Sequence, residues 1–327
     1  MGVLRVVLGL GVACGLALFV VRVRSLAREP IAIASAPAPL FATNESCRAC
    51  HREIWDEWQA DEHSRAWFNE PFLAQDPKKS ECNACHASRP ILEVGLAQPA
   101  EIRAARFEEG IGCLECHANV DHVEGPNGGT GACAPRANAA FRTSEVCAPC
   151  HAAHGTLDEW RATSFAAVGV TCQTCHMPEV TRPSATGGAP RRVRSHRMRT
   201  QADVTMLQEA VRLEARVEGE ELVVRLANVG AAHAVPGEIF NRELFLATRV
   251  LARDGSELAA FRESLRTVRR EQRASGPSTQ LAAGEERRFE YALPAGAAAA
   301  ELLLGYKRFY LIPDEEAVRV HAQRLEL

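Results

Sequence analysis

Cysteine and histidine recur in one fixed pattern through the first half of this 327-residue chain. The pattern is Cys-x-x-Cys-His, and its five copies are Cys47/Cys50/His51, Cys82/Cys85/His86, Cys113/Cys116/His117, Cys147/Cys150/His151 and Cys172/Cys175/His176. Two cysteines at this spacing can form thioethers to the vinyl groups of one haem, and the next histidine can then bind the iron. A zinc knuckle or redox dithiol would need every second cysteine to precede a histidine by accident. The sequence therefore predicts five c-type haems, with these five histidines as proximal iron ligands.

Each haem iron can take a second axial ligand, and six histidines lie outside the motifs. The candidate distal ligands are His63, His122, His196, His233 and His154, which would allow all five irons two histidines each. His321 is more typical of a surface position. Met177, Met198 and Met206 are alternatives that suit packing better. Cys133 is predicted to be a free thiol, with iron coordination or an intermolecular disulfide as alternatives.

The motif region contains an internal repeat. In the first copy the leading motif is followed by Trp58 and His63, and in the second by Trp160 and Phe165. A second, glycine-led motif then ends each copy, and the motif at Cys82 is an insertion into the first. Phe165 stands where the repeat places a histidine, which leaves one axial position in question.

Several segments of this repeat resemble a known family. The order of the motifs, the tryptophan helix, "GIGCLECHANVDH" and "GVTCQTCHMP" resemble the multihaem cytochromes of the cytochrome c-554 and hydroxylamine oxidoreductase superfamily, over residues 44–200. The resemblance implies closely packed haems, with distal ligands at His63, beyond the tryptophan helix, and at His122, beyond the third motif. Residues 230–237 are similar to a His-x-x-Pro loop of appended β-domains, which implies that His233 reaches a haem.

The hydrophobic pattern divides the chain into two folded regions. Residues 44–200 are expected to form a mostly α, irregular, haem-packed cytochrome domain. From residue 207 to 327 apolar and polar residues alternate in short runs, which predicts an antiparallel β-sandwich. The expected strands are 211–217, 222–226, 244–252, 258–261, 289–293 and 302–312, with Asp254-Gly255 as a primed hairpin turn.

The N-terminus predicts export. Residues 6–21 form an apolar run flanked by Arg5 and Arg22, so residues 1–28 are interpreted as an uncleaved signal anchor, a transmembrane helix, before a Pro/Ala-rich linker at 29–43. Because thioether haem attachment takes place outside the cytoplasm, we expect the protein on the periplasmic side of the bacterial inner membrane. The alternative is a soluble periplasmic protein after cleavage near residues 32–36.

These features favour electron transfer. An iron with two strong axial ligands has no position for a substrate and can only change its oxidation state. The expected partners are redox proteins, such as a membrane quinol-oxidising or terminal reductase complex. The net charge of −3, with no concentrated basic face, argues against nucleic acid. The alternative is an enzyme that reduces or oxidises a small nitrogen or sulfur compound at one five-coordinate haem, and a third reading makes the sandwich a partner-binding module.

Overall fold

The computed structural model describes residues 42–73, 80–130, 132–200, 203–237, 241–267 and 279–327, all within one compact unit, Leu40–Leu327. The predicted anchor at 1–28 and nearly all of the linker lie outside the described residues. Within the described ranges, no helix is both long enough and apolar enough to cross a membrane.

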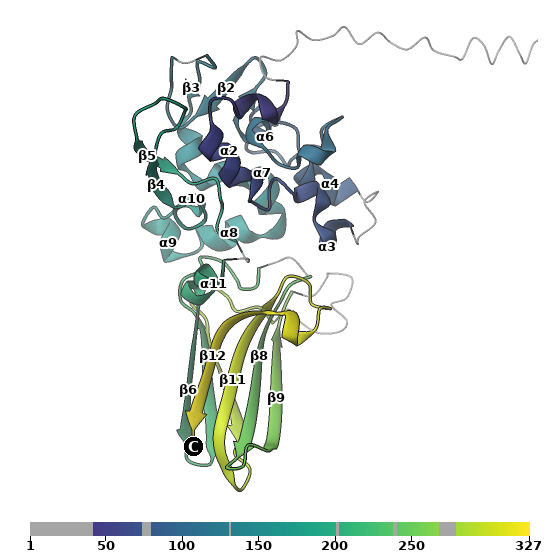
Figure 1. Ribbon diagram of the computed structural model, residues 1–327, viewed down its shortest axis with the longest axis vertical. Coiled ribbons are helices and arrows are strands. Elements are labelled where there is room, and N and C mark those ends of the chain that lie inside the picture. The colour runs from purple at the N-terminus through teal and green to yellow at the C-terminus, as the bar shows by residue number, and fades with distance from the viewer. Residues whose placement is uncertain (1–41, 74–79, 131, 201–202, 238–240, 268–278) are drawn as a thin grey trace, which may run out of the picture. The chain divides into compact units, whose positions relative to one another are not determined.

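Short helices make up the region that carries the five motifs (Figure 1). The α-helices are α2 (Arg52–Gln59), α3 (Glu70–Leu73), α4 (Ser80–His86), α5 (Ile91–Val94), α6 (Cys113–His117), α7 (Ala148–His151), α8 (Thr156–Arg161), α9 (Ser164–Ala167) and α10 (Cys172–His176). The 3₁₀ turns are η1 (Asn44–Cys47), η2 (Ala66–Phe68), η3 (Phe107–Glu109), η4 (Ala139–Arg142), η5 (Ser144–Cys147) and η6 (Ala152–His154). Helices this short are marginal in water by themselves. Packing around a shared interior must therefore hold this region together.

Small sheets complete the motif region. One has the order β1-β2-β3 and the other pairs β4 with β5, from β1 (Ala118–Asn119), β2 (His122–Gly125), β3 (Arg136–Ala137), β4 (Glu179–Arg182) and β5 (Arg191–Arg194). The loop after β5 leads to α11 (Val204–Ala210), which ends directly at the first long strand. The mostly helical character expected for residues 44–200 is thus seen, with two small sheets in addition.

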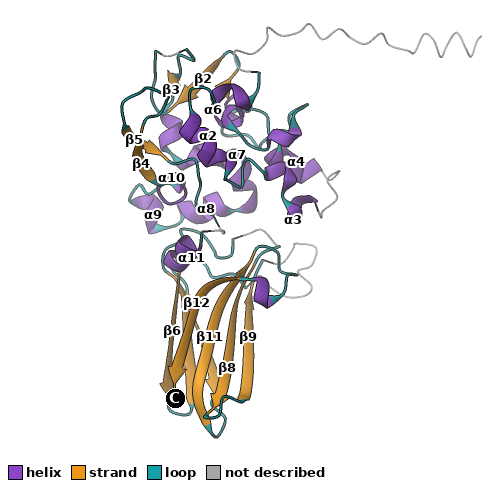
Figure 2. Ribbon diagram, in the orientation of Figure 1, coloured by secondary structure: helices purple, strands orange, loops and turns teal. Residues whose placement is uncertain are grey.

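Two antiparallel sheets form the C-terminal region (Figure 2). One has the order β10-β7-β6 and the other β12-β11-β8-β9. The strands are β6 (Val211–Glu218), β7 (Glu221–Asn228), β8 (Glu243–Ala252), β9 (Glu257–Leu265), β10 (Glu286–Ala292), β11 (Ala297–Lys307) and β12 (Val318–Glu326), with η8 (Asp314–Glu316) before the last. Apolar side chains of both sheets share one core, for example Leu222, Leu226, Leu246 and Leu304, which are fully buried.

The alternating pattern located six of these strands and misplaced two details. β11 begins at Ala297 and ends at Lys307, earlier than the expected 302–312, because Ala299 and Ala300 are buried and pair with β8. Alanine has low strand propensity, so tertiary packing overrides it here. In the β8–β9 hairpin only Gly255 has a positive φ, at 86°, whereas a type I′ turn needs two such residues.

Gly305 in β11 provides a test of sandwich packing. A Cβ atom there would lie 2.3 Å from Cζ of Phe245 on the neighbouring strand β8. Because Phe245 is fully buried, the ring has little room to move. We expect Gly305→Ala to lower the free energy of unfolding by about 1–3 kcal/mol. Denaturant unfolding followed by far-ultraviolet circular dichroism would measure it, and the half-exposed Leu258→Ala, expected to change little, is the control.

Candidate functional site

Each Cys-x-x-Cys-His motif occupies a helical turn. Four of them end the helices α4, α6, α7 and α10, and the first runs from η1 to the residue before α2. Residues three and four apart lie on the same face of a helical turn. The two thiols and the imidazole of each motif therefore face the same side, as attachment of one planar group requires.

Four of the five motif histidines are oriented by the backbone. The Nδ1 atoms lie within hydrogen-bonding distance of carbonyl oxygens, in the pairs His51–Ser184 at 2.5 Å, His86–Ala66 at 2.5 Å, His117–Glu124 at 2.7 Å and His176–Arg199 at 2.7 Å. A neutral imidazole that donates from Nδ1 keeps the lone pair of Nε2 for a metal. The four rings are thus oriented as metal ligands with Nε2 available.

Three motif histidines each face a histidine from elsewhere in the chain. The ring centroids are 6.3 Å apart in all three pairs, His63–His151, His117–His196 and His176–His233. A metal–imidazole bond is about 2 Å long. Two such bonds, together with the distance from each nitrogen to its ring centre, account for this separation. The three pairs therefore fit an iron held between two imidazoles.

The partner histidines are oriented in the same way as the motif histidines. Nδ1 of His63 lies 2.8 Å from Oδ1 of Asp61, and Nδ1 of His233 lies 2.9 Å from the carbonyl oxygen of Ala234. Nδ1 of His196 lies 3.2 Å from the carbonyl oxygen of Arg194. In each case Nδ1 has an acceptor, so Nε2 is the nitrogen left to face the opposite ring.

The environment keeps the buried rings neutral. Burial lowers the pKa of His151 to about 3 and that of His196 to about 4, and it also lowers the pKa of His117 and His176. Neutral imidazole is the form that binds a metal. By surface area His151 is nevertheless exposed. The protein packed around the imidazole, rather than the exposed area of the whole residue, sets its pKa, so the ring is neutral.

The arrangement suits a haem better than a metal ion bound by protein alone. Across the part of the chain that the structure describes, no group of three or more His, Cys, Asp or Glu side chains is arranged to hold a metal ion. A haem iron takes only its axial ligands from the protein. Paired imidazoles beside paired thiols are the protein groups that a c-type haem needs, so the residues fit this cofactor.

Thiols of different motifs lie next to one another. The thiol of Cys47 lies beside that of Cys113, and the thiol of Cys147 lies beside that of Cys172. Cys85 of the inserted second motif contacts Cys150 of the fourth. The first motif therefore adjoins the third, and the fourth adjoins both the second and the fifth.

The sequence repeat is also a structural repeat. Trp58 in α2 donates from Nε1 to the carbonyl oxygen of Ile111 at 2.8 Å, and Trp160 in α8 donates to that of Val170 at 2.9 Å. Ile111 and Val170 stand at the same position, two residues before the first cysteine of the glycine-led motif. In each copy the tryptophan thus ties the leading motif to the closing one.

Phe165 keeps the backbone role of the residue it replaces. The carbonyl oxygen of His63 accepts a hydrogen bond from the N–H of Ile111 at 2.8 Å, and that of Phe165 accepts one from Val170 at 2.9 Å. Only the side chain differs between the copies. The fifth motif, which follows Phe165, has His233 opposite its histidine.

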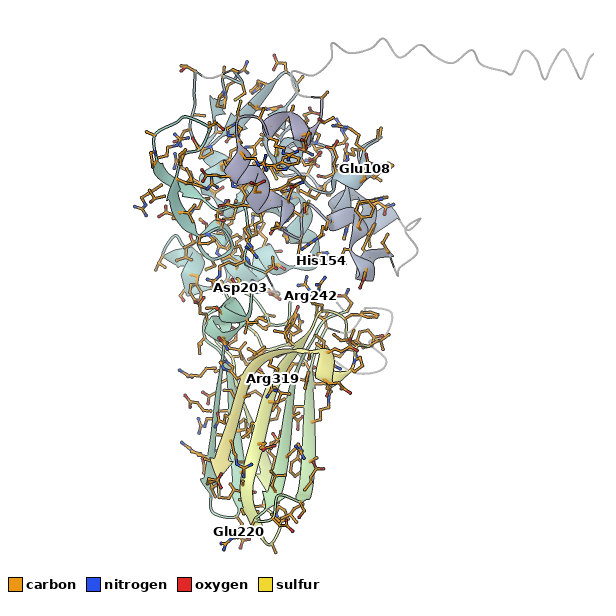
Figure 3. The ribbon with its side chains drawn as sticks, in the orientation of Figure 1. Glu108, His154, Asp203, Glu220, Arg242 and Arg319 are labelled. Atoms are coloured by element: carbon orange, nitrogen blue, oxygen red, sulfur yellow. The ribbon has the colours of Figure 1, made fainter. Side chains whose placement is uncertain are left out.

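The other candidate residues have different surroundings. Nδ1 of His122 lies 2.8 Å from Asp121 and Nε2 lies 2.9 Å from Glu124, so both nitrogens contact carboxylates and the predicted ligand role gains no support. His154 (Figure 3) lies at the surface, but partial burial of its imidazole, followed by the nearby Arg242 and His86, lowers its pKa. Its role stays a prediction.

The residues outside the candidate ligand set also have defined places. Nε2 of His321 contacts the carbonyl oxygen of Val211 at 2.6 Å within the sandwich. Cys133 is a half-buried free thiol. The backbone N–H of Met198 donates to Asp61, the residue that also orients His63.

Sequence reasoning missed an acidic residue in each copy. Oε2 of Glu57 accepts a hydrogen bond from the N–H of His196 at 2.8 Å, and Oε2 of Glu159 accepts one from the N–H of Ala234 at 2.8 Å. The signal was present, because each glutamate directly precedes the repeated tryptophan within the triplet Asp-Glu-Trp.

Comparisons with known proteins find similar cytochromes. The family model described as cytochrome c554 and c-prime matches residues 46–118. The chain has the fold of a penta-haem cytochrome c552 from Thermochromatium tepidum, with a TM-score of 0.65 and 19% identity over 87% of this chain and 98% of that one.

Two further comparisons add little. The ApaA protein of Bordetella pertussis matches 35% of this chain and 89% of its own length, at 15% identity and a TM-score of 0.20. A comparison with curated protein sequences gives no match.

The two tryptophan hydrogen bonds should contribute equally to stability. Trp58→Phe and Trp160→Phe each leave a carbonyl oxygen, of Ile111 or Val170, without its donor. Each change is expected to cost about 1–3 kcal/mol of unfolding free energy, measured by denaturant titration of the haem-loaded protein. Trp67→Phe, where a ring can still stack on Phe107, is the control. If only one of the two substitutions left the free energy of unfolding unchanged, the structural equivalence of the two copies would be contradicted.

Proposed function

We propose that this protein is an extracytoplasmic pentahaem cytochrome c that transfers electrons between redox partners. The observation that carries the proposal is the common 6.3 Å separation of three histidine pairs. The likeness in fold to a penta-haem cytochrome supports both the cofactor and the count of five. The matching number of Cys-x-x-Cys-His motifs in this chain agrees with it.

The proposed axial pairs cover three of the five sites. His151 is paired with His63 at the fourth motif, His117 with His196 at the third, and His176 with His233 at the fifth. Haem iron bound between two imidazoles supplies a one-electron couple, ferric to ferrous, with no position for a substrate. The chain's contribution is to hold each pair of rings at a fixed separation and to keep the buried motif rings neutral.

Contacts between motifs suggest the electron route. The thiol contacts place the first motif against the third, and the second and fifth against the fourth. His63 belongs to the first copy of the repeat and faces the leading motif of the second copy, so it joins the two halves. We infer a continuous path with the fourth motif as its branch point.

Location and partners belong to the same proposal. Thioether attachment of haem takes place outside the cytoplasm, which supports the periplasmic side of the inner membrane. Residues 1–28 would tether the protein there. A membrane quinol-oxidising or terminal reductase complex would then be its redox partner.

The second candidate function is redox catalysis on a small nitrogen or sulfur compound. None of the three pairs includes His51 or His86, and the His86 ring stacks on Phe72 with centroids 4.0 Å apart. The argument for an open iron position therefore no longer rests on Phe165. It rests on the first and second motifs, whose histidines belong to none of the three pairs. An iron held there with an open sixth position would bind exogenous ligands.

Replacement of His233 tests the axial pairing. His233→Ala removes the ring opposite His176, so one haem should become high-spin in the ferric electron paramagnetic resonance spectrum and should bind cyanide. His321→Ala, which lies within the sandwich against Val211, is the control and should leave the spectrum unchanged. If His233→Ala also left it unchanged, the proposed pairing would be wrong.

The haem count can be tested separately. The chain should carry five haems, measured as pyridine haemochrome per chain and by the mass of the intact protein. Cys82→Ser with Cys85→Ser removes both thioether positions of the inserted motif and should reduce the count to four. Cys133→Ser should leave it at five, and any loss in that control would contradict the assignment of Cys133 as a free thiol.

A further inference from the structure

One acidic side chain recurs at the same place in both copies of the repeat. The triplet Asp-Glu-Trp occurs at 56–58 in α2 and at 158–160 in α8. The two aspartates of these triplets point outward, with Asp56 53% and Asp158 79% exposed. The glutamates instead contact the segments that carry the histidines opposite the glycine-led motifs.

Glu159 holds the residue that orients His233. Its Oε2 atom accepts the backbone N–H of Ala234 at 2.8 Å. The carbonyl oxygen of the same Ala234 lies 2.9 Å from Nδ1 of His233. The ring of His233 then faces His176 of the fifth motif. One carboxylate on the helical region thus fixes a loop of the sandwich next to its histidine.

Glu57 does the same for His196 through two contacts. Its Oε2 atom accepts the backbone N–H of His196 at 2.8 Å and pairs with Nη2 of Arg182 at 2.8 Å. Arg182, itself buried, also contacts the carbonyl oxygen of Arg194 at 3.4 Å, and that oxygen lies 3.2 Å from Nδ1 of His196. The ring of His196 faces His117 of the third motif.

The contacts of Glu57 and Glu159 are alike although the two histidines that they hold come from unrelated segments. His196 lies in the loop after β5, whereas His233 lies between strands of the sandwich. Glu57 accepts the N–H of the histidine itself, and Glu159 accepts the N–H of the residue after it. In both cases the carboxylate also helps to hold the carbonyl group that orients the histidine ring. The shared position of the glutamates in the repeat, rather than any local similarity of the loops, accounts for the agreement.

We propose that Glu57 and Glu159 are duplicated positioning residues that hold His196 and His233 over the third and fifth haem sites. This inference rests on the axial pairs of the proposed function. A histidine on a loop must be ordered before it can remain on an iron, which costs conformational entropy. A hydrogen bond to a carboxylate is stronger than one between neutral groups, so it offsets part of that cost.

A purely structural carboxylate would behave differently. Its loss would lower stability while the iron ligands stayed in place. Loss of a positioning residue releases the histidine more often, so an exogenous ligand competes more successfully for the same iron. Cyanide affinity and ferric spin state therefore separate the two roles, whereas the melting temperature does not.

The experiment compares four full-length, haem-loaded variants: Glu159→Ala, Glu159→Gln, Asp158→Ala and His233→Ala. Cyanide binding is titrated optically, and the high-spin signal is recorded by electron paramagnetic resonance. Glu159→Ala should raise cyanide affinity at one haem by roughly tenfold or more, the factor expected for losing a hydrogen bond to a charged group. Glu159→Gln keeps an oxygen acceptor and should stay near the wild type. Asp158→Ala is the neighbouring control and should not differ from it.

The remaining outcomes separate this inference from the function it rests on. If His233→Ala produces a high-spin haem but Glu159→Ala behaves like Asp158→Ala, the positioning role is wrong and the axial pair stands. A lower melting temperature in Glu159→Ala with unchanged cyanide affinity would likewise overturn the role. If His233→Ala changes nothing, the axial pair fails and this inference fails with it.

Glu57 provides an independent repetition at the third site. Glu57→Ala also leaves the buried Arg182 without its carboxylate, which is expected to lower the stability of the fold. Glu57→Gln preserves an acceptor for His196 while weakening the pair with Arg182, so its cyanide affinity should rise less than in Glu57→Ala. The exposed Asp56→Ala is its control. Equal cyanide binding in Glu57→Ala and Asp56→Ala, both folded, would contradict the duplicated role.

Discussion

The fixed separation of facing imidazole rings is the constraint on which the rest of the structure depends. In three pairs the centroids lie 6.3 Å apart, a separation suited to one iron between the two rings. The helices that carry these rings are short, and α2, the longest of the described helices around the motifs, has eight residues. Such helices have little stability of their own. The haems of the proposed function would therefore supply the interior around which this region packs, with the protein as the ligand-bearing shell.

The duplicated unit provides the same local contacts at two pairs of motifs. In both copies a tryptophan joins the leading motif to the glycine-led motif, and the glutamate before it contacts the segment opposite that motif. Phe165 shows that the backbone contact does not require a histidine side chain. Its carbonyl keeps the contact made by His63, while its side chain has no imidazole to offer. The backbone of the unit is therefore the same in both copies although the side chain differs.

The C-terminal region combines an independent core with a loop that carries one of the facing histidines. Its two sheets bury their own apolar residues, so it does not depend on haem for a core. The loop that carries His233 extends from this core, and Glu159 of the helical region binds the next residue. A rigid sheet framework suits a ligand that must reach a distant site, because a framework held by its own packing loses less entropy when the ligand binds.

Much of this architecture could be read from the chain. The five motifs, the internal repeat, the resemblance to multihaem cytochromes and most of the strands were evident, since each depends on spacing within a few residues. The resemblance is confirmed by the family model over residues 46–118 and by the fold. The early start of β11 was missed because alanines in a strand carry little local signal.

The sequence by itself determined which residues can attach haem, because two cysteines and a histidine on one helical turn share a face whatever surrounds them. Only the tertiary structure decided which histidines stand opposite one another, since each pair joins segments far apart in the chain. It gave His63, His196 and His233 a facing ring, and it gave His122 two carboxylates instead. It also decided which backbone groups Glu57 and Glu159 hold, because the repeated Asp-Glu-Trp triplet marks the two carboxylates but not the distant N–H groups that donate to them.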